Sequence, residues 1–162
     1  MVPGTNRRQS VETGGGLTKD GLQSKEFHFV YLQLGGLNMG WINEEMKGVI
    51  EEQRLSYVAT ASKNGRPNVS PKGSIVYVDE NTLAFAAVRS EKTLANIQEN
   101  PWAAVAVLDV PNRKGFQFKG KTEKVNEGDI YNRVVEPLKK RLPNLPSPQY
   151  VVVVRIDEVH TF

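Results

Sequence analysis

Short runs of alternating apolar and polar residues, separated by turn residues, occupy most of the chain after residue 54. Such alternation is typical of β-strands that bury one face. The runs predict about six strands, at residues 55–62, 68–78, 82–88, 102–110, 116–125 and 150–162. Tight turns join most of them, and Asn64–Gly65 is the strongest hairpin signal. We therefore expect a mainly β fold in which about six antiparallel strands close into a small barrel, because closure removes exposed strand edges.

Two or three short helices interrupt the predicted strands. In the segment INEEMKGVIEEQ, Asn43 is a good N-cap, and Met46, Val49 and Ile50 form one apolar face. A second helix is predicted at about 91–99, with Pro101 as its stop signal. A third, at about 127–140, contains Pro137, which is expected to kink or divide it.

Residues 1–38 differ in composition from the remainder. The first 25 or so are rich in Gly, Ser, Thr and charge, which predicts a flexible N-terminal extension ahead of one domain at 39–162. One hypothesis takes Met39 as the natural start, because Gly35–Gly36 could be encoded by a bacterial ribosome-binding sequence just upstream of it. A genuine flexible tail is the alternative.

Composition removes several classes of chemistry. The chain has no cysteine and two histidines, which excludes disulfides, thiol nucleophiles and cysteine metal sites and leaves no metal site to propose. No apolar run approaches a membrane span, and the N-terminus has no apolar core behind its charges, so we expect a cytoplasmic location and no membrane partner. The formal charge of +3 is only mildly basic, so we expect no nucleic-acid partner, and an anionic small ligand suits the charge at least as well.

Unusual charge stands at the start of the second predicted helix, in FAAVRSEKTLANIQENP. Ser90 is a credible N-cap, and Lys92 and Thr93 lie in the first turn beside backbone N–H groups that lack helical partners. A lysine there opposes the helix dipole, unless an anion such as phosphate lies between them. The alternative is an ordinary helix start with a solvated lysine.

Two further polar rows lie on predicted strands. In NVSPKGS, Ser70, Lys72 and Ser74 share one face, which either lines a polar ligand site or defends an exposed edge. In GFQFKGKTEK, Gln117 and Lys119 alternate with two phenylalanines, a spacing that more often forms core than stacks on bases. The chain has no GxSxG, GxxxxGK[ST], GxGxxG or HExxH motif.

The segment GRPNVSPKGSIVYVDENTLAFAAVRSEKTLANIQENPWAAVAVLD, followed by GFQFKGKTEKV, resembles the pyridoxamine 5′-phosphate oxidase-like family of FMN-binding split barrels. The resemblance covers roughly Asn43 to Phe162. It implies a split barrel, FMN as cofactor and a homodimer with FMN sites at the interface. It assigns the flavin phosphate to Arg89, Ser90, Lys92 and Thr93, with Ala87 just before them. It assigns the ring and ribityl chain to Asn68, Val69, Ser70 and Lys72, with Gln117 and Trp102 as weaker candidates.

The sequence also departs from the family's oxidases. Their Arg- and Trp-containing C-terminal segment, which grips the substrate, does not occur before Phe162, and Arg66 is one place away from their flavin-contacting arginine. The resemblance therefore implies an FMN-dependent oxidoreductase with a small-molecule or protein redox partner rather than a true pyridoxamine phosphate oxidase. The alternative is a non-enzymatic FMN electron carrier or flavin sensor, and a nucleic-acid-binding barrel is a third. No catalytic acid or base stands out.

Overall fold

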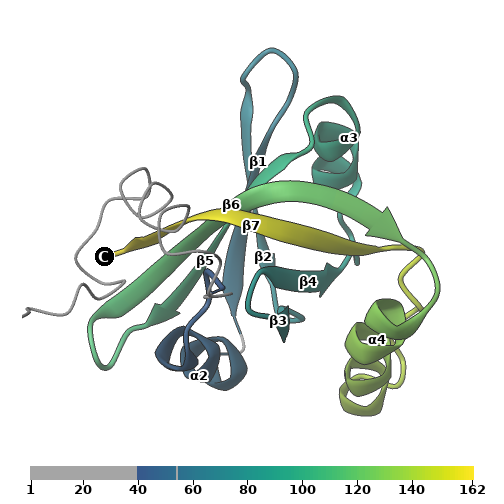
Figure 1. Ribbon diagram of the computed structural model, residues 1–162. Coiled ribbons are helices and arrows are strands. Elements are labelled where there is room, and N and C mark those ends of the chain that lie inside the picture. Colours follow the sequence, from purple (N-terminus) through teal and green to yellow (C-terminus); the bar gives the residue numbers. More distant parts are fainter. Residues whose placement is uncertain (1–39, 54) are drawn as a thin grey trace, which may run out of the picture. The chain divides into compact units, whose positions relative to one another are not determined.

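A single antiparallel sheet organises the part of the chain that the computed structural model describes, residues 40–53 and 55–162 (Figure 1). Its seven strands lie in the order β2-β1-β5-β6-β7-β4-β3. The strands are β1 (Ser56–Ala61), β2 (Pro67–Lys72), β3 (Val76–Asp79), β4 (Thr82–Ala86), β5 (Trp102–Asp109), β6 (Lys114–Val125) and β7 (Val151–Thr161). The helices are α2 (Glu44–Glu52), α3 (Glu91–Glu99) and α4 (Asp129–Arg141). The expected mainly β, antiparallel split-barrel fold is confirmed. The expectation for residues 1–38 lies outside the described residues.

The two ends of the sheet order are neighbours in the chain. Strands β2 and β3 stand at opposite ends of the order, yet only residues 73–75 join them. Three linking residues span at most about 14 Å from strand to strand, since an extended residue covers about 3.5 Å. The sheet therefore has to curl until its ends approach each other, which is the geometry of a barrel.

Strands β6 and β7 are the longest and belong to both halves of the barrel. Their pairing shifts between Lys119 and Gly120, where Asp157 is the extra residue on β7. Such a bulge bends a strand and increases its twist. At this bend a Cβ on Gly120 would lie 1.9 Å from the carbonyl oxygen of Arg155, so the close approach of the two backbones requires glycine.

Both faces of β4 and of the first half of β7 are buried. Leu83, Phe85, Val152 and Val154 belong to the barrel core, together with residues of α2, β1, β5 and β6. Their neighbours Ala84, Ala86, Val151 and Val153 form a second core with α4. Helix α4 therefore covers the outside of this half of the barrel.

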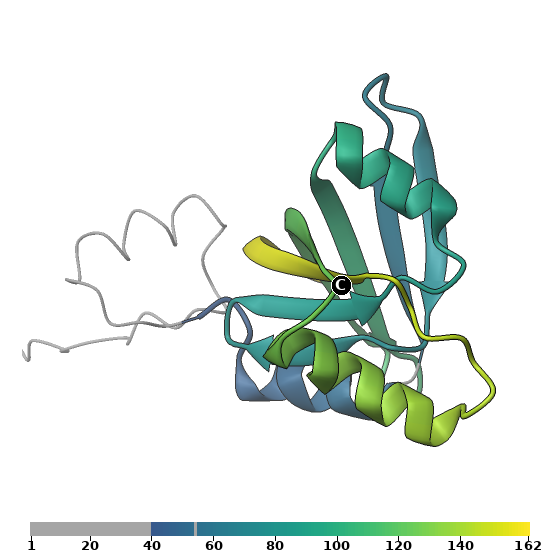
Figure 2. The same cartoon turned by 90° about the vertical axis from the view of Figure 1, so that its right-hand side faces the viewer.

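Helices α2 and α4 lie at one end of the molecule, and α3 lies at the other, beside the β1–β2 hairpin (Figures 1 and 2). As expected, Asn43 caps α2 by accepting a hydrogen bond from the N–H of Met46 at 2.9 Å, and Met46, Val49 and Ile50 are buried. The predicted hairpin is confirmed too, with Gly65 at a φ of 78° in the turn.

Two details differ from expectation. The predicted strand at 68–78 is two strands, because the chain leaves β2 after Lys72 and pairs with β4 only from Val76. Helix α4 is not divided at Pro137, and Val134, Val135 and Leu138 on both sides of the proline are buried; of the two expected outcomes, a kink or a division, only division is contradicted. None of the helices in residues 40–53 and 55–162 is both long and apolar enough to cross a membrane.

Candidate functional site

The polar row of β2 faces α3 and the barrel interior. Asn68 and Ser70 are half-buried and Lys72 is buried, whereas Val69, between them, is 62% exposed. Strand β1 pairs Thr60 with Asn68 and Ser56 with Lys72, so polar residues of both strands share this face. The predicted alternation is therefore correct, and it directs Val69 away from the row.

A hydrogen-bond network joins β1, β2 and α3. The hydroxyl of Thr60 accepts from the side-chain amides of Asn96 at 3.1 Å and Asn68 at 3.4 Å. The amide of Asn68 also lies 3.4 Å from the hydroxyl of Thr93 in the first turn of α3. Thr60, Thr93 and Asn96 are all buried, so these bonds fix the start of α3 against the hairpin.

Lys72 is a buried cation at the end of the polar row. The residue is only 5% exposed, and its Nζ donates a hydrogen bond to Oγ of Ser90 at 2.7 Å. Nζ also lies 5.9 Å from the centroid of the Phe85 ring. Within the described residues no carboxylate lies within 4.0 Å of it. Burial lowers the pKa of Lys72, and the charge of Glu91 partly opposes that shift.

Ser90 occupies the N-cap position of α3, but its hydroxyl does not cap the helix. Instead Oγ donates to the carbonyl oxygen of Val88 at 2.9 Å and accepts from Lys72. The prediction of Ser90 as the N-cap residue is therefore confirmed, although its hydroxyl bonds to Val88 and Lys72 and leaves the helix N–H groups free. Among the described residues nothing accepts from the backbone N–H groups of Glu91, Lys92 and Thr93.

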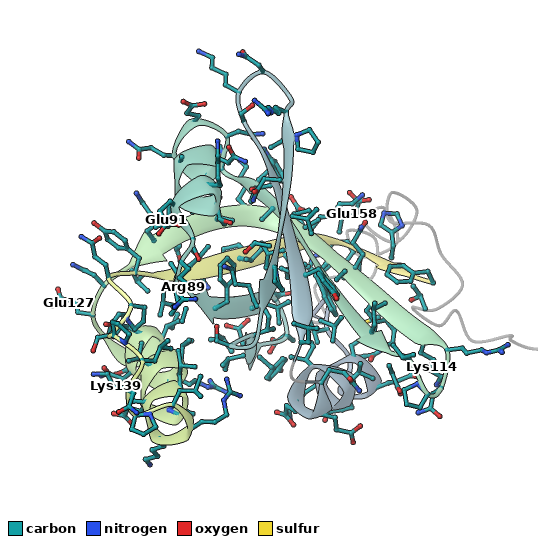
Figure 3. All side chains as sticks on the ribbon, turned by 180° about the vertical axis from the view of Figure 1, so that it is seen from behind. Arg89, Glu91, Lys114, Glu127, Lys139 and Glu158 are labelled. Carbon is teal, nitrogen blue, oxygen red and sulfur yellow. The ribbon has the colours of Figure 1, made fainter. Side chains whose placement is uncertain are left out.

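Arg89 connects this helix start to a neighbouring cleft. Its φ of 47° is unusual for a residue other than glycine, and such strain is more often found at functional sites. Arg89 and Lys92 are exposed, and Figure 3 shows Arg89 and Glu91 on the side of α3 that faces α4. Arg89 lines a cleft of about 220 Å³. It is lined by Ala87, Val88, Arg89, Leu145, Pro146, Ser147, Pro148 and Gln149.

The remaining predicted site residues lie elsewhere in a single copy of the chain. Gln117 is half-buried on β6, on the face opposite the buried Phe116 and Phe118. Trp102, at the start of β5, is 43% exposed, and Nζ of Lys121 lies 5.5 Å from its ring centroid. The structure therefore brings together the candidates from β2 and α3, and leaves these two outside that group.

Thr60 and Asn96 also belong to this group of residues, although neither was predicted as a site residue. Asn96 follows Thr93 by three positions, so both lie on one face of α3. Thr60 belongs to the inward row of β1 with Ser56 and Val58. A search for polar residues on the buried faces of both elements could have found them.

Together these groups suit a bound phosphate ester. Three free N–H groups at a helix start, the adjacent Lys92 and the buried Lys72 provide donors and positive charge in one place. The buried cation without a carboxylate partner is the observation that favours an anionic group, since buried charges are normally paired. The neighbouring cleft leaves room for an apolar body attached to that group.

Comparison with known proteins places the chain in a family. The sequence model described as pyridoxamine 5′-phosphate oxidase matches residues 42–162. The chain belongs to the pyridoxamine 5′-phosphate oxidase family. An uncharacterized family relative from Methanocaldococcus jannaschii is 33% identical over 138 residues, which are 84% of this chain and 89% of that protein.

Two further comparisons concern a longer enzyme and a protein of the same fold. The pyridoxine/pyridoxamine 5′-phosphate oxidase of Crocosphaera subtropica is 25% identical over 120 residues, 74% of this chain but only 52% of the oxidase. The chain thus spans about half of that enzyme's length. An FMN-binding protein from Syntrophomonas wolfei shares the fold, with a TM-score of 0.67 and 17% identity over 85% of this chain and 95% of that one.

Proposed function

We propose that this protein binds FMN non-covalently and uses it as an oxidoreductase. The observation that carries the proposal is the start of α3, where unused backbone N–H groups lie beside Lys92 and a buried Lys72. Membership of the pyridoxamine 5′-phosphate oxidase family and the FMN-binding protein of the same fold support the same cofactor.

Each group of the site has a role in this proposal. The N–H groups of α3, Lys92, Thr93 and Arg89 hold the phosphate through charge-assisted hydrogen bonds. The polar row Asn68–Ser70–Lys72 follows the ribityl chain and the edge of the flavin ring. When bound, FMN supplies the redox chemistry, and the protein supplies placement and charge. The cytoplasmic location expected from the sequence belongs to the same proposal.

A homodimer completes the proposal. The outward face of the β2-β1-β5 part of the sheet exposes three large side chains, with Val69 62%, Trp102 43% and Tyr57 39% exposed. Between them lie small residues such as Ala104 and Ala106, which form a flat surface. Aromatic and apolar residues of this kind are typical of protein interfaces. In a dimer through this face, Gln117 and Trp102 of one copy lie at the border of the partner's site.

The first test is the visible spectrum of the purified protein. We expect a yellow protein that releases FMN on denaturation, or a colourless one that gains flavin absorbance when incubated with FMN. A protein that stays colourless after incubation would contradict the proposal. Analytical ultracentrifugation of the same sample tests the dimer, and a monomer at all concentrations would exclude sites shared between copies.

The second test separates phosphate recognition from ring recognition. Replacing Lys92 and Thr93 together by alanine removes charge-assisted bonds to phosphate, so we expect FMN to bind about tenfold to a hundredfold more weakly. Riboflavin, which lacks the phosphate, should lose little affinity. Lys63→Ala is the matched control, because Lys63 is an exposed lysine at the hairpin turn. Equal losses for FMN and riboflavin would contradict the phosphate assignment.

A flavin carrier or sensor is the second candidate. The observation in its favour is that, among the described residues, the titratable side chains gathered at the site are Lys72, Arg89, Glu91 and Lys92, with no described histidine beside them. Turnover of an electron acceptor with NADH or NADPH favours the enzyme. Reduction of the flavin only by a partner protein favours the carrier.

A further inference from the structure

A second pocket, of about 320 Å³, lies away from the start of α3. Its walls are the last turn of α2, the chain from Gly73 to Tyr77 and the side of α4. The volume falls at the small end of the range for small-molecule sites. We call it the arginine pocket, and its main lining residues are Ile50, Glu51, Ile75, Tyr77, Arg133 and Arg141.

The two arginines of α4 are held in place by backbone carbonyls. Arg133 donates through Nη1 to the carbonyl oxygen of Val78 at 3.0 Å, and Arg141 donates through Nη2 to that of Gly73 at 2.5 Å. A guanidinium has five N–H donors, so most donors of each arginine remain available. Fixed guanidiniums with free donors lose less entropy on binding an acid group than mobile ones do.

The charges of this pocket are not balanced by ion pairs. In residues 40–53 and 55–162 no carboxylate lies within 4.0 Å of either guanidinium. By contrast, Arg155 of β7 pairs with Glu123 at 2.7 Å. Glu51 lines the same pocket and has no ion pair either, so two cations face one carboxylate. Nearby Lys47, whose Nζ lies 5.3 Å from the ring centroid of Tyr77, pairs with Glu44 at 3.7 Å and so adds no unpaired charge.

One function of these arginines is already visible, because β3 is the last strand of the sheet order. Its outer edge has free carbonyl groups, and the side chains of Arg133 and Arg141 cover two carbonyls on and beside it. This protection uses one N–H of each arginine. It does not account for a pocket in which two arginines without ion pairs lie beside an apolar wall of Ile50 and Ile75.

We propose that the arginine pocket binds a small organic acid, with a carboxylate or phosphate group on a compact apolar or aromatic body. The acid group takes the free donors of Arg133 and Arg141, and the body lies against Ile50, Ile75 and the ring of Tyr77. Glu51 favours ligands that also carry a hydrogen-bond donor. The proposal does not depend on FMN, since none of these groups belongs to the site at α3.

The test is an NMR titration of the full chain with three probes that share one ring: phenyl phosphate, benzoate and benzyl alcohol. We expect saturable shifts of the Gly73 and Tyr77 amides and of the two arginine Nε–H signals with at least one of the acids, and none with the alcohol. The comparison of phenyl phosphate with benzoate tells which acid group is preferred. Arg133→Gln with Arg141→Gln should weaken acid binding by about tenfold or more.

Lys139→Gln is the matched control, because Lys139 is an exposed cation in the last turn of α4 that does not line the pocket. Phenyl phosphate could also reach the start of α3, so the amides of Lys92 and Thr93 are followed in the same spectra. Shifts at Gly73 and Tyr77 that persist in Lys92→Ala support the arginine pocket. Failure of the FMN proposal leaves these shifts unchanged, which keeps the two proposals distinguishable.

Three results would overturn the proposal. They are no saturable shift with either acid, equal shifts with benzyl alcohol, and acid binding that the arginine substitutions leave unchanged. Because the glutamine variants uncover the edge of β3, Arg133→Lys is a second test that keeps the charge and loses the planar fork. If the variants only self-associate and the natural protein binds neither acid, the arginines serve edge protection alone.

Discussion

The half of the barrel around β4 and the first part of β7 and the half around β2 differ in which residues they bury. Around β4 and β7 both faces of the sheet are covered, and Leu83, Ala84, Val153 and Val154 are fully buried. At β2 the sheet places polar residues inside and leaves Val69 outside, 62% exposed. The half around β4 and β7 buries apolar side chains on both faces. The β2 half places polar side chains and a lysine on its inner face, where apolar residues are usually found. If the proposed site is correct, the fold separates the part that stabilises it from the part that binds a ligand.

The largest expected loss of stability comes from a substitution in the half around β4 and β7. Leu83→Ala removes a fully buried side chain from the barrel core and should lower the free energy of unfolding by about 2 to 5 kcal/mol. Val69→Ala on the exposed face should change it by less than about 0.5 kcal/mol. Urea denaturation followed by circular dichroism measures both. Equal losses would show that the two halves do not differ in the way described.

The second-largest loss of stability is expected from a substitution at Gly120, in the bend of β6 and β7. Gly120→Ala places a Cβ against the carbonyl of Arg155, so β6 and β7 must move apart, at a cost of about 1 to 3 kcal/mol. Gly48→Ala in α2 is the control, because no atom lies within 4 Å of the added Cβ. That control should stabilise the protein by about 0.5 to 1 kcal/mol. A neutral Gly120→Ala would mean that the backbones separate freely.

A substitution in the hydrogen-bond network at α3 should lower stability by as much as Gly120→Ala or less, and it should weaken FMN binding more. Thr60→Val keeps the shape of the side chain and removes the acceptor for the amides of Asn68 and Asn96. We expect a loss of about 1 to 3 kcal/mol in the free energy of unfolding and weaker FMN binding. Thr60→Ser, which restores the hydroxyl, should recover most of the FMN affinity. If Thr60→Ser binds FMN no better than Thr60→Val, the hydrogen bonds are not the cause.

Lys72→Met should have the smallest effect on stability and a clear effect on its pH dependence. Burial lowers the pKa of Lys72 below its ordinary value of 10.5. Between the lowered pKa and 10.5 the unfolded chain therefore binds more protons than the folded protein, so this lysine makes the free energy of unfolding rise with pH. In Lys72→Met that contribution is absent, while FMN binding weakens.

Urea titrations of both proteins at several values between about pH 7 and 10 test this sign. The difference in unfolding free energy between the natural protein and Lys72→Met should move in favour of the natural protein as the pH rises. A constant difference would show that Lys72 is as well solvated in the folded state as in the unfolded one.

Local patterns were sufficient to predict much of this fold. The cap and buried face of α2, the β1–β2 hairpin and the bounds of α3 follow from residues close together in the chain. The alternation of β2 likewise identified Ser70 and Lys72 as facing one way. Such features depend on side-chain period and turn chemistry, which a sequence displays directly.

Features that depend on distant residues could not be predicted. The Ser90 hydroxyl is taken by Lys72, 18 positions away, and the Thr60 hydroxyl by Asn96, 36 positions away. The undivided course of helix α4 at Pro137, next to the buried Val134 and Leu138, depends on packing against the sheet that the local sequence does not display. The split between β2 and β3 follows from barrel closure, which is a property of the whole sheet.

The place of β7 in the sheet also determines when the group of residues at α3 can be held in position during synthesis. By the time residue 100 is synthesised, every side chain of the β2 and α3 group already exists. Strand β4, which leads directly into that helix, is bonded only to the short β3 until β7 arrives as its second neighbour. Since a domain of this size folds as a unit, the proposed FMN site needs β7 to be in place. A chain stalled before β7 would carry every residue of the proposed phosphate site, and we expect it to retain no FMN.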